Sequence, residues 1–271
     1  MANILNASVV GRGEAVLVLA NGLGTNQQTW RHIVAAFAEE YRILRFDYVG
    51  TPDATLATFD TRRYRTLHGH ADDVIALLDE LGIADATWVG HSVSGTIGLL
   101  AAVAAPELIS RLVLISASPR YLDDVGYVGG FSRDQIDELI AAAIGDFHTW
   151  VGGFSPAVLG SAGSPEHVKE FSSDLLRMRP DIAYQTLETI FSSDHRDILP
   201  RVTQPVSIVQ SQNDVAVPMA VGRYLADQLP HAILHEMRAE GHLPHLTAPE
   251  EVIAIVRAAL AIPRPANLAL A

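Results

Sequence analysis

The sequence predicts an α/β protein in which a mostly parallel central sheet is flanked by helices and carries an inserted helical lid. Continuous apolar runs typical of buried strands alternate with segments of helical periodicity, and between residues 132 and 193 this alternation gives way to helices alone. A third observation is the stretch 86–104, which reads as a strand, a sharp turn of small residues and a helix, with Ser92 at the apex.

Composition limits the classes of function. The chain of 271 residues is 49% hydrophobic and 18% charged, which suits a large folded domain and excludes global disorder. The net charge of −12 argues against binding nucleic acid or an anionic membrane surface. Cysteine is absent, no apolar run reaches the roughly 18 residues that span a bilayer, and the first residues lack signal-peptide features. We therefore expect a cytoplasmic protein.

The first half of the chain contains the expected strands and helices in regular order. The run 15–20 is apolar throughout and bounded by glycines, whereas 70–81 has apolar residues at helical spacing and Gly82 as a cap. The predicted elements are a strand at 15–20, a helix at 28–39, a strand at 41–46, a helix at 70–81, the strand and helix around Ser92, and a strand at 112–115.

Helix start signals define the lid. Ser132 and Gln135 form a capping box with Phe131 as a possible staple residue, and further helices start at Ser164-Pro165 and at Pro180. The alternation then resumes with strands at 205–210 and 233–237 and helices at 217–229 and 249–260. We predict a core of residues 1–120 and 195–262, a lid of residues 121–194, and a flexible tail at 263–271.

Three polar residues follow strands that end at the same edge of the predicted sheet. Ser92 follows one strand, Asp214 the strand at 205–210, and His242 the strand at 233–237. This chain order of nucleophile, acid and base fits a Ser-His-Asp triad, because a serine hydroxyl needs a base and the base needs an orienting acid. His245 is an alternative base, which the position of His242 directly after Glu240-Gly241 disfavours.

The remaining candidates for site residues are alternative acids, backbone donors and a pair of histidines. Asp194 and Asp197 are alternative candidates for the acid of the triad. Their position at the lid exit favours solvent-exposed or helix-capping residues instead. The oxyanion hole requires backbone N–H groups, and we expect them at Leu23 and Val93. His68 and His70 flank a glycine without a neighbouring carboxylate cluster, so we predict neither a metal nor a cofactor.

The lid is rich in aromatic side chains. Each of them could equally belong to the lid's own core, but together they predict a mostly apolar cavity over Ser92 for a small neutral ligand. They are Tyr121, Tyr127, Phe131, Phe147, Trp150, Phe154 and Phe191.

Several motifs resemble those of the α/β-hydrolases, within the branch of the bacterial stress regulator RsbQ and the plant strigolactone and karrikin receptors. The match runs from about residue 5 to 260. The carrying motifs are Phe-Asp-Tyr-Val-Gly at 46–50, Gly-His-Ser-Val-Ser at 90–94, Ala-Ser-Pro-Arg-Tyr-Leu at 117–122, Gly-Gly-Phe at 129–131, Met-Arg-Pro-Asp-Ile at 178–182 and Glu-Gly-His-Leu-Pro-His-Leu at 240–246.

The resemblance implies an α/β-hydrolase fold, a V-shaped lid of four helices, the triad of Ser92, Asp214 and His242, and slow hydrolysis of a butenolide-like ester or lactone. The pocket positions that it implies are Leu23, Tyr121, Phe131, Trp150, Phe154 and Phe191. The chain departs from the family at Leu23, where phenylalanine is usual, and from plant members at Asn21 and Phe154, which replace a histidine and a tyrosine.

Two classes of function fit these features. In the first, the protein is a serine hydrolase that turns over a small, largely apolar ester or lactone. In the second, it is a ligand sensor that hydrolyses slowly and acts on a signalling partner protein. A cofactor-free lyase or carbon–carbon hydrolase shares the fold and stays open as a third reading. Both main hypotheses need the triad and the lid, so the sequence does not separate them.

Overall fold

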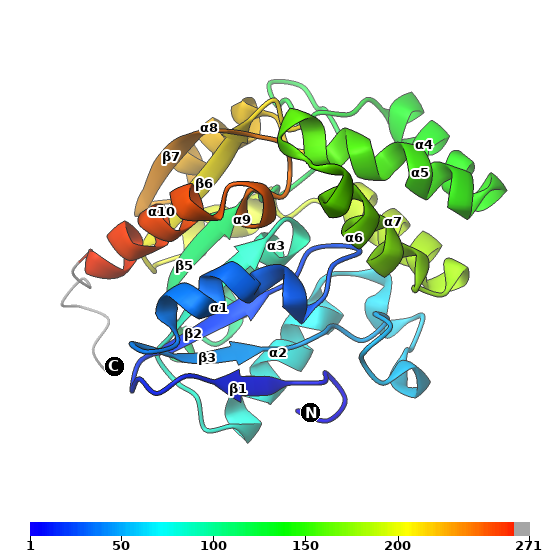
Figure 1. The fold of residues 1–271 in the computed structure, drawn as a ribbon. Coiled ribbons are helices and arrows are strands. Elements are labelled where there is room, and N and C mark those ends of the chain that lie inside the picture. The colour runs from blue at the N-terminus through cyan, green and yellow to red at the C-terminus, as the bar shows by residue number, and fades with distance from the viewer. Residues whose placement is uncertain (263–271) are drawn as a thin grey trace.

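A seven-stranded sheet forms the centre of the molecule, as seen in a computed structural model that describes residues 1–262 (Figure 1). The strand order is β1-β3-β2-β4-β5-β6-β7, and every neighbouring pair is parallel except β1 with β3. The predicted α/β class is confirmed. The strands are β1 (Ser8–Val10), β2 (Val16–Ala20), β3 (Arg42–Arg45), β4 (Ala86–His91), β5 (Ile109–Ile115), β6 (Val206–Gln212) and β7 (Ala232–Glu240).

Helices cover both faces of the sheet, which explains the continuous apolar runs of its central strands. In β2, Leu17 and Leu19 pack in the cluster that contains residues of α1 and α10, whereas Val16 and Val18 face the cluster of α2 and α3. The helices of the core are α1 (Arg31–Phe37), α2 (His68–Glu80), α3 (Val93–Ala104), α8 (Met219–Gln228), α9 (Pro244–Thr247) and α10 (Pro249–Ala261).

Four helices form the lid above the carboxyl edge of the sheet (Figure 1). Its chain ends are adjacent, because Arg120 and Asp194 form an isolated bridge and an ion pair with Nη1···Oδ2 at 2.5 Å. The capping box of Ser132 and Gln135 is present, and Ser164 also caps its helix. The lid helices are α4 (Arg133–Gly145), α5 (Phe147–Leu159), α6 (Pro165–Leu176) and α7 (Pro180–Ser192).

The structure differs from the sequence prediction mainly at short elements and boundaries. The edge strand β1 was not predicted, because three residues carry little periodic signal. The start of α5, capped by the Asp146 side chain, was also missed. The helix expected at 28–39 divides into a 3₁₀ turn, Gln27–Trp30, and the shorter α1. The predicted tail at 263–271 lies outside the described residues.

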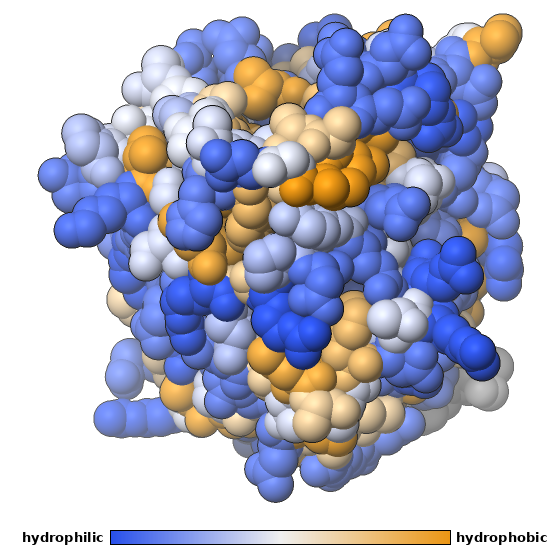
Figure 2. Space-filling view, turned by 90° about the vertical axis from the view of Figure 1, so that its right-hand side faces the viewer, coloured by the Kyte–Doolittle hydropathy of each residue, from blue (hydrophilic) through white to orange (hydrophobic). Residues whose placement is uncertain are grey.

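The surface in one view is mostly hydrophilic. Hydrophilic residues cover most of the face shown in Figure 2, and hydrophobic residues appear there as separate patches. Within residues 1–262, no helix is long and apolar enough to span a bilayer.

Candidate active site

Ser92 occupies a strained turn between β4 and α3. Its backbone has φ 56° and ψ −126°, a region that residues with a side chain rarely adopt. Glycine is required on both sides of the turn: a Cβ on Gly90 would lie 2.6 Å from the Ser94 carbonyl oxygen, and one on Gly95 would lie 2.4 Å from Ala117 Cβ. The predicted elbow is therefore present, and it fixes the serine at the carboxyl edge of the sheet.

The three residues predicted as a triad form one hydrogen-bonded chain. The Ser92 hydroxyl lies 2.9 Å from Nε2 of His242, and the opposite nitrogen, Nδ1, lies 2.8 Å from Oδ2 of Asp214. All three residues are buried. In the neutral imidazole with Nδ1–H donating to the carboxylate, Nε2 carries a free lone pair and can accept the serine proton.

Asp214 is held as a carboxylate. Burial alone would raise the pKa of its carboxyl group, but the facing His242 and its hydrogen bond, together with the N–H groups of Val217 and Ala216, lower that pKa below the usual range. The side chain is thus negative at neutral pH. A carboxylate in this position orients the imidazole and stabilises the imidazolium that forms when it takes a proton.

The loop after β2 lies against the elbow. A Cβ on Gly22 would sit 2.5 Å from His91 Nδ1 and 3.2 Å from Ser92 Cβ, so only glycine permits this approach. The loop places Leu23 beside the cavity that contains Ser92. Among the hydrogen bonds of residues 1–262, neither the Leu23 nor the Val93 N–H has a backbone acceptor. The two N–H groups expected to form the oxyanion hole are therefore not used in backbone hydrogen bonds of the described chain.

Ser94 joins the elbow to that loop, a role that sequence reasoning missed. Its hydroxyl donates to the Asn21 carbonyl oxygen and lies 3.0 Å from the Tyr48 hydroxyl. Since a hydroxyl has one hydrogen and the carbonyl can only accept, the Tyr48 O–H donates to Ser94. Asn21 lies 73 positions from Ser94 in the sequence, and no local pattern links the two.

A mostly apolar cavity lies over Ser92 and His242. Of the predicted pocket residues, Leu23, Tyr121, Phe154 and Phe191 line it. The Tyr121 hydroxyl lies 3.4 Å from Ser92 Oγ, and burial raises the pKa of this phenol, so it remains a neutral hydrogen-bond donor.

Phe131 and Trp150 do not line this cavity. They support residues that do: the Phe131 ring lies 5.3 Å from that of Phe191, and Trp150 stacks on Phe154 at 4.6 Å. Phe171 does line it and was not predicted, although the amphipathic pattern of α6 was the available signal. Other lining residues that the sequence prediction omitted are Val158, Ile190, Ala216 and Leu243.

The alternative acids and bases have other partners. His245 Nε2 lies 2.9 Å from the Thr29 hydroxyl, and its ring stacks on Trp30 at 4.5 Å. Asp194 pairs with Arg120 and with Arg196. Within residues 1–262, no group of three histidine or carboxylate side chains is placed to hold a metal ion.

The fold and the hydrogen-bonded Ser-His-Asp chain define the α/β-hydrolase class, and the chain belongs to this family. The family described as alpha/beta hydrolase fold matches residues 15–249. The protein is therefore a hydrolase by family and fold.

Its relatives confirm the narrower resemblance to the plant receptors. The chain is 43% identical to karrikin insensitive 2 receptor CA of Petunia hybrida over 93% of each protein. It is 41% identical to strigolactone esterase D14 of Arabidopsis thaliana, covering 94% of this chain and 96% of that one. Among solved structures, a hydrolase from Oleispira antarctica superposes with a TM-score of 0.92 at 32% identity, over 95% and 94% of the two chains.

Proposed function

We propose that this protein hydrolyses a small, largely apolar ester or lactone of butenolide type. The observation that carries the proposal is the hydrogen-bonded chain from Ser92 through His242 to Asp214, which lies at an apolar cavity lined in part by lid helices. The names of the relatives, an esterase and receptors of small molecules, point to the same class of ligand.

The geometry supports a two-step reaction. As the Ser92 oxygen attacks the carbonyl carbon, His242 Nε2 takes the hydroxyl proton, and the carbonyl oxygen becomes an oxyanion that accepts hydrogen bonds from the N–H groups of Leu23 and Val93. His242 then gives its proton to the leaving alkoxide as the carbon–oxygen bond breaks. Water attacks the acyl-enzyme with His242 again as base, which releases the carboxylic acid and restores Ser92.

The first experiment measures hydrolysis of p-nitrophenyl acetate and of a synthetic butenolide, following both the product and the mass of the protein. Ser92→Ala should lower kcat by several orders of magnitude, up to about 10⁶-fold if the triad acts as a unit. Ser116→Ala is a matched control, because this buried hydroxyl has no hydrogen-bond partner in the described chain and should keep the wild-type rate. Equal rates for wild type and Ser92→Ala would overturn the proposal.

A second candidate function is a sensor that hydrolyses its ligand slowly and acts on a partner protein. The receptor names among the relatives favour it. Turnover separates the two: an enzyme completes many cycles on its natural ligand, whereas a sensor completes few and retains an adduct on Ser92 or His242. Mass spectrometry of the protein after a stoichiometric butenolide pulse measures this difference.

A further inference from the structure

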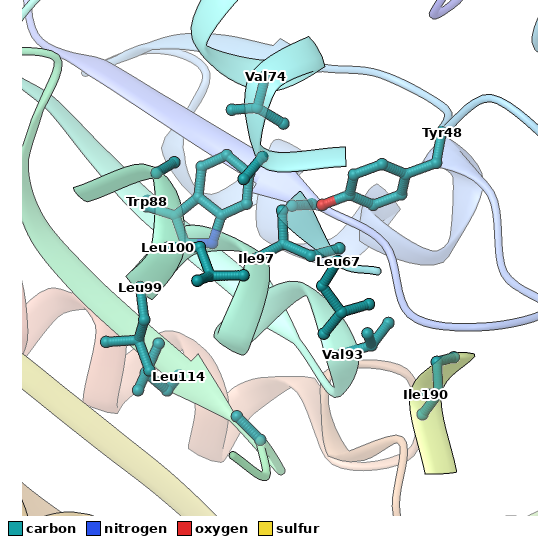
Figure 3. Close-up of a cluster of buried hydrophobic side chains, with 14 of the residues drawn as sticks. Tyr48, Leu67, Val74, Trp88, Val93, Ile97, Leu99, Leu100, Leu114 and Ile190 are labelled. Atoms are coloured by element: carbon teal, nitrogen blue, oxygen red, sulfur yellow. The ribbon is translucent and has the colours of Figure 1, made fainter. Parts of the chain in front are cut away.

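A second cavity lies beside the one that contains Ser92. It shares Leu23 and Ile190 with the first cavity as common walls, but neither Ser92 nor His242 lines it. Five of its wall residues are visible in Figure 3, where Leu67 and Val93 lie between Tyr48 and Ile190 and next to Ile97. The proposed hydrolysis does not use this space.

The walls of the second cavity carry one polar side chain with an unused hydrogen-bonding atom. The Tyr64 hydroxyl donates to Asp73 at 2.7 Å, the Thr189 hydroxyl to the Tyr64 carbonyl at 3.1 Å, and Tyr48 bonds to Ser94. The hydroxyls of Thr51 and Thr186 also donate to backbone carbonyls, and both polar atoms of the Asn21 amide have partners. By contrast, Nδ1 of His70 is buried and has no partner within residues 1–262.

His70 is a rigid, neutral group in this setting. Its side chain is 9% exposed, stacks on Tyr64 at 4.7 Å and meets Tyr48 edge-on at 5.3 Å. Burial, assisted by the charge of Arg63, lowers the pKa of the imidazole to about 4. At neutral pH the ring is therefore uncharged, with one donor and one acceptor nitrogen, and a charged ligand would lack a counter-ion here.

We propose that this second cavity binds a small, neutral, mostly aromatic or aliphatic molecule through a single hydroxyl or carbonyl group that hydrogen-bonds to His70. The apolar walls supply the contact area and the imidazole supplies the orientation. The site is separate from the cavity of Ser92, so both can be occupied together. Binding does not depend on the proposed hydrolysis. The second cavity adjoins that chemistry through the shared walls Leu23 and Ile190 and through Val93, whose N–H is one of the two expected oxyanion donors.

Methionine methyl NMR tests the site directly. The chain has four methionines, and of the three besides the N-terminal residue only Met178 lines the second cavity. With ¹³C-methyl methionine, titration of p-cresol should give a saturable shift of the Met178 signal, with Met219 and Met237 unmoved. Toluene, which lacks the hydroxyl, should bind roughly three- to ten-fold more weakly, as expected for the loss of one neutral hydrogen bond. No Met178 shift up to the solubility limit of p-cresol overturns the proposal.

Two variants locate the ligand. His70→Phe keeps the ring volume and should reduce p-cresol affinity to that of toluene while leaving toluene affinity unchanged. Phe154→Ala alters only the Ser92 cavity and should leave p-cresol affinity unchanged. If Phe154→Ala lowers p-cresol affinity and His70→Phe does not, the ligand lies over Ser92 and a separate site is refuted. The comparison of p-cresol with toluene on the wild type needs no variant and so holds even if His70→Phe fails to fold.

Kinetics provide an independent readout. If the cavities are separate, saturating p-cresol should leave KM for p-nitrophenyl acetate unchanged, whereas a competitive rise in KM contradicts the proposal. Ser92→Ala protein should bind p-cresol with wild-type affinity. The two proposals can thus fail separately. If the proposed hydrolysis is wrong, the Met178 shift on p-cresol binding remains; if the second site is wrong, that shift is absent whether or not the protein hydrolyses esters.

Discussion

Replacing Ser94 with alanine tests whether the elbow positions the oxyanion loop. The Ser94 side chain is fully buried, and its hydroxyl bonds to the Asn21 carbonyl and the Tyr48 hydroxyl. Ser94→Ala removes this hydroxyl without filling its place. The Asn21 carbonyl oxygen and the Tyr48 hydroxyl then both lose a partner in a buried environment.

The expected loss of stability follows from these two groups. A buried polar group left without a partner costs about 1 to 3 kcal/mol, so we expect the free energy of unfolding to fall by roughly 2 to 4 kcal/mol. Asn21 directly precedes Gly22-Leu23, so the released loop should also misplace the Leu23 N–H. Removal of one oxyanion donor costs about 10²- to 10³-fold in kcat, and displacement of a donor should cost on the order of 10-fold.

The assay combines urea denaturation with kcat for p-nitrophenyl acetate. Ser116→Ala again serves as the control, since it deletes a buried hydroxyl without a partner in residues 1–262 and should change neither quantity appreciably. The double variant Ser94→Ala/Tyr48→Phe should lose less stability than the sum of the single variants, because the two side chains share one hydrogen bond. Wild-type stability and activity in Ser94→Ala would show that the loop holds its position without this bond.

Further predictions concern the triad, the loop and pH. Asp214→Asn should lower ester kcat by about 10⁴-fold with little change in KM, because the amide fixes the wrong imidazole tautomer; an unchanged rate would remove Asp214 from the triad. Gly22→Ala should lower kcat on the order of 10²-fold, since the new Cβ lies 2.5 Å from His91 Nδ1, whereas Gly152→Ala, in lid helix α5 with no atom within 4 Å of its Cβ, should keep full activity. Burial lowers the pKa of His70 in the folded state to about 4 from 6.5, so below pH 6.5 the unfolded chain binds a proton that the folded chain does not. The free energy of unfolding should therefore fall by up to about 1.4 kcal/mol per pH unit from this group as pH drops from 6.5 to 4. Urea denaturation at pH 7 and at pH 5 should show a smaller change in the free energy of unfolding for His70→Phe than for wild type. Equal changes in the two proteins would contradict a lowered pKa of His70.

Long elements and their order were predictable because they depend on local patterns. The apolar run of β2 is buried at every residue, as its sequence indicated. The helix α4 begins at the capping box of Ser132 and Gln135 and ends at Gly145, as predicted. Short elements were missed for the opposite reason. The edge strand β1 is held in place by pairing with β3, a partner that is distant in the sequence.

The pocket residues were also only partly predictable from the sequence. An aromatic residue in the lid can face the cavity or support a neighbour, and composition does not distinguish the two. Tyr121, Phe154 and Phe191 reach the cavity, whereas Phe131 and Trp150 pack behind them. For Trp150, Phe154 and Phe191, which lie on lid helices, the choice depends on the rotation of the helix, which is set by its contacts with the other helices and the core.

The sequence by itself determined the fold class and the order in which nucleophile, acid and base follow their strands. Parallel strands bring their carboxyl ends to one edge, so this order is enough to place Ser92, Asp214 and His242 near one another. Only the tertiary structure decided how Ser94 connects the elbow to Asn21 and that a second cavity with His70 adjoins the first. Both features join residues far apart in the chain, and such contacts leave no periodic trace in the sequence.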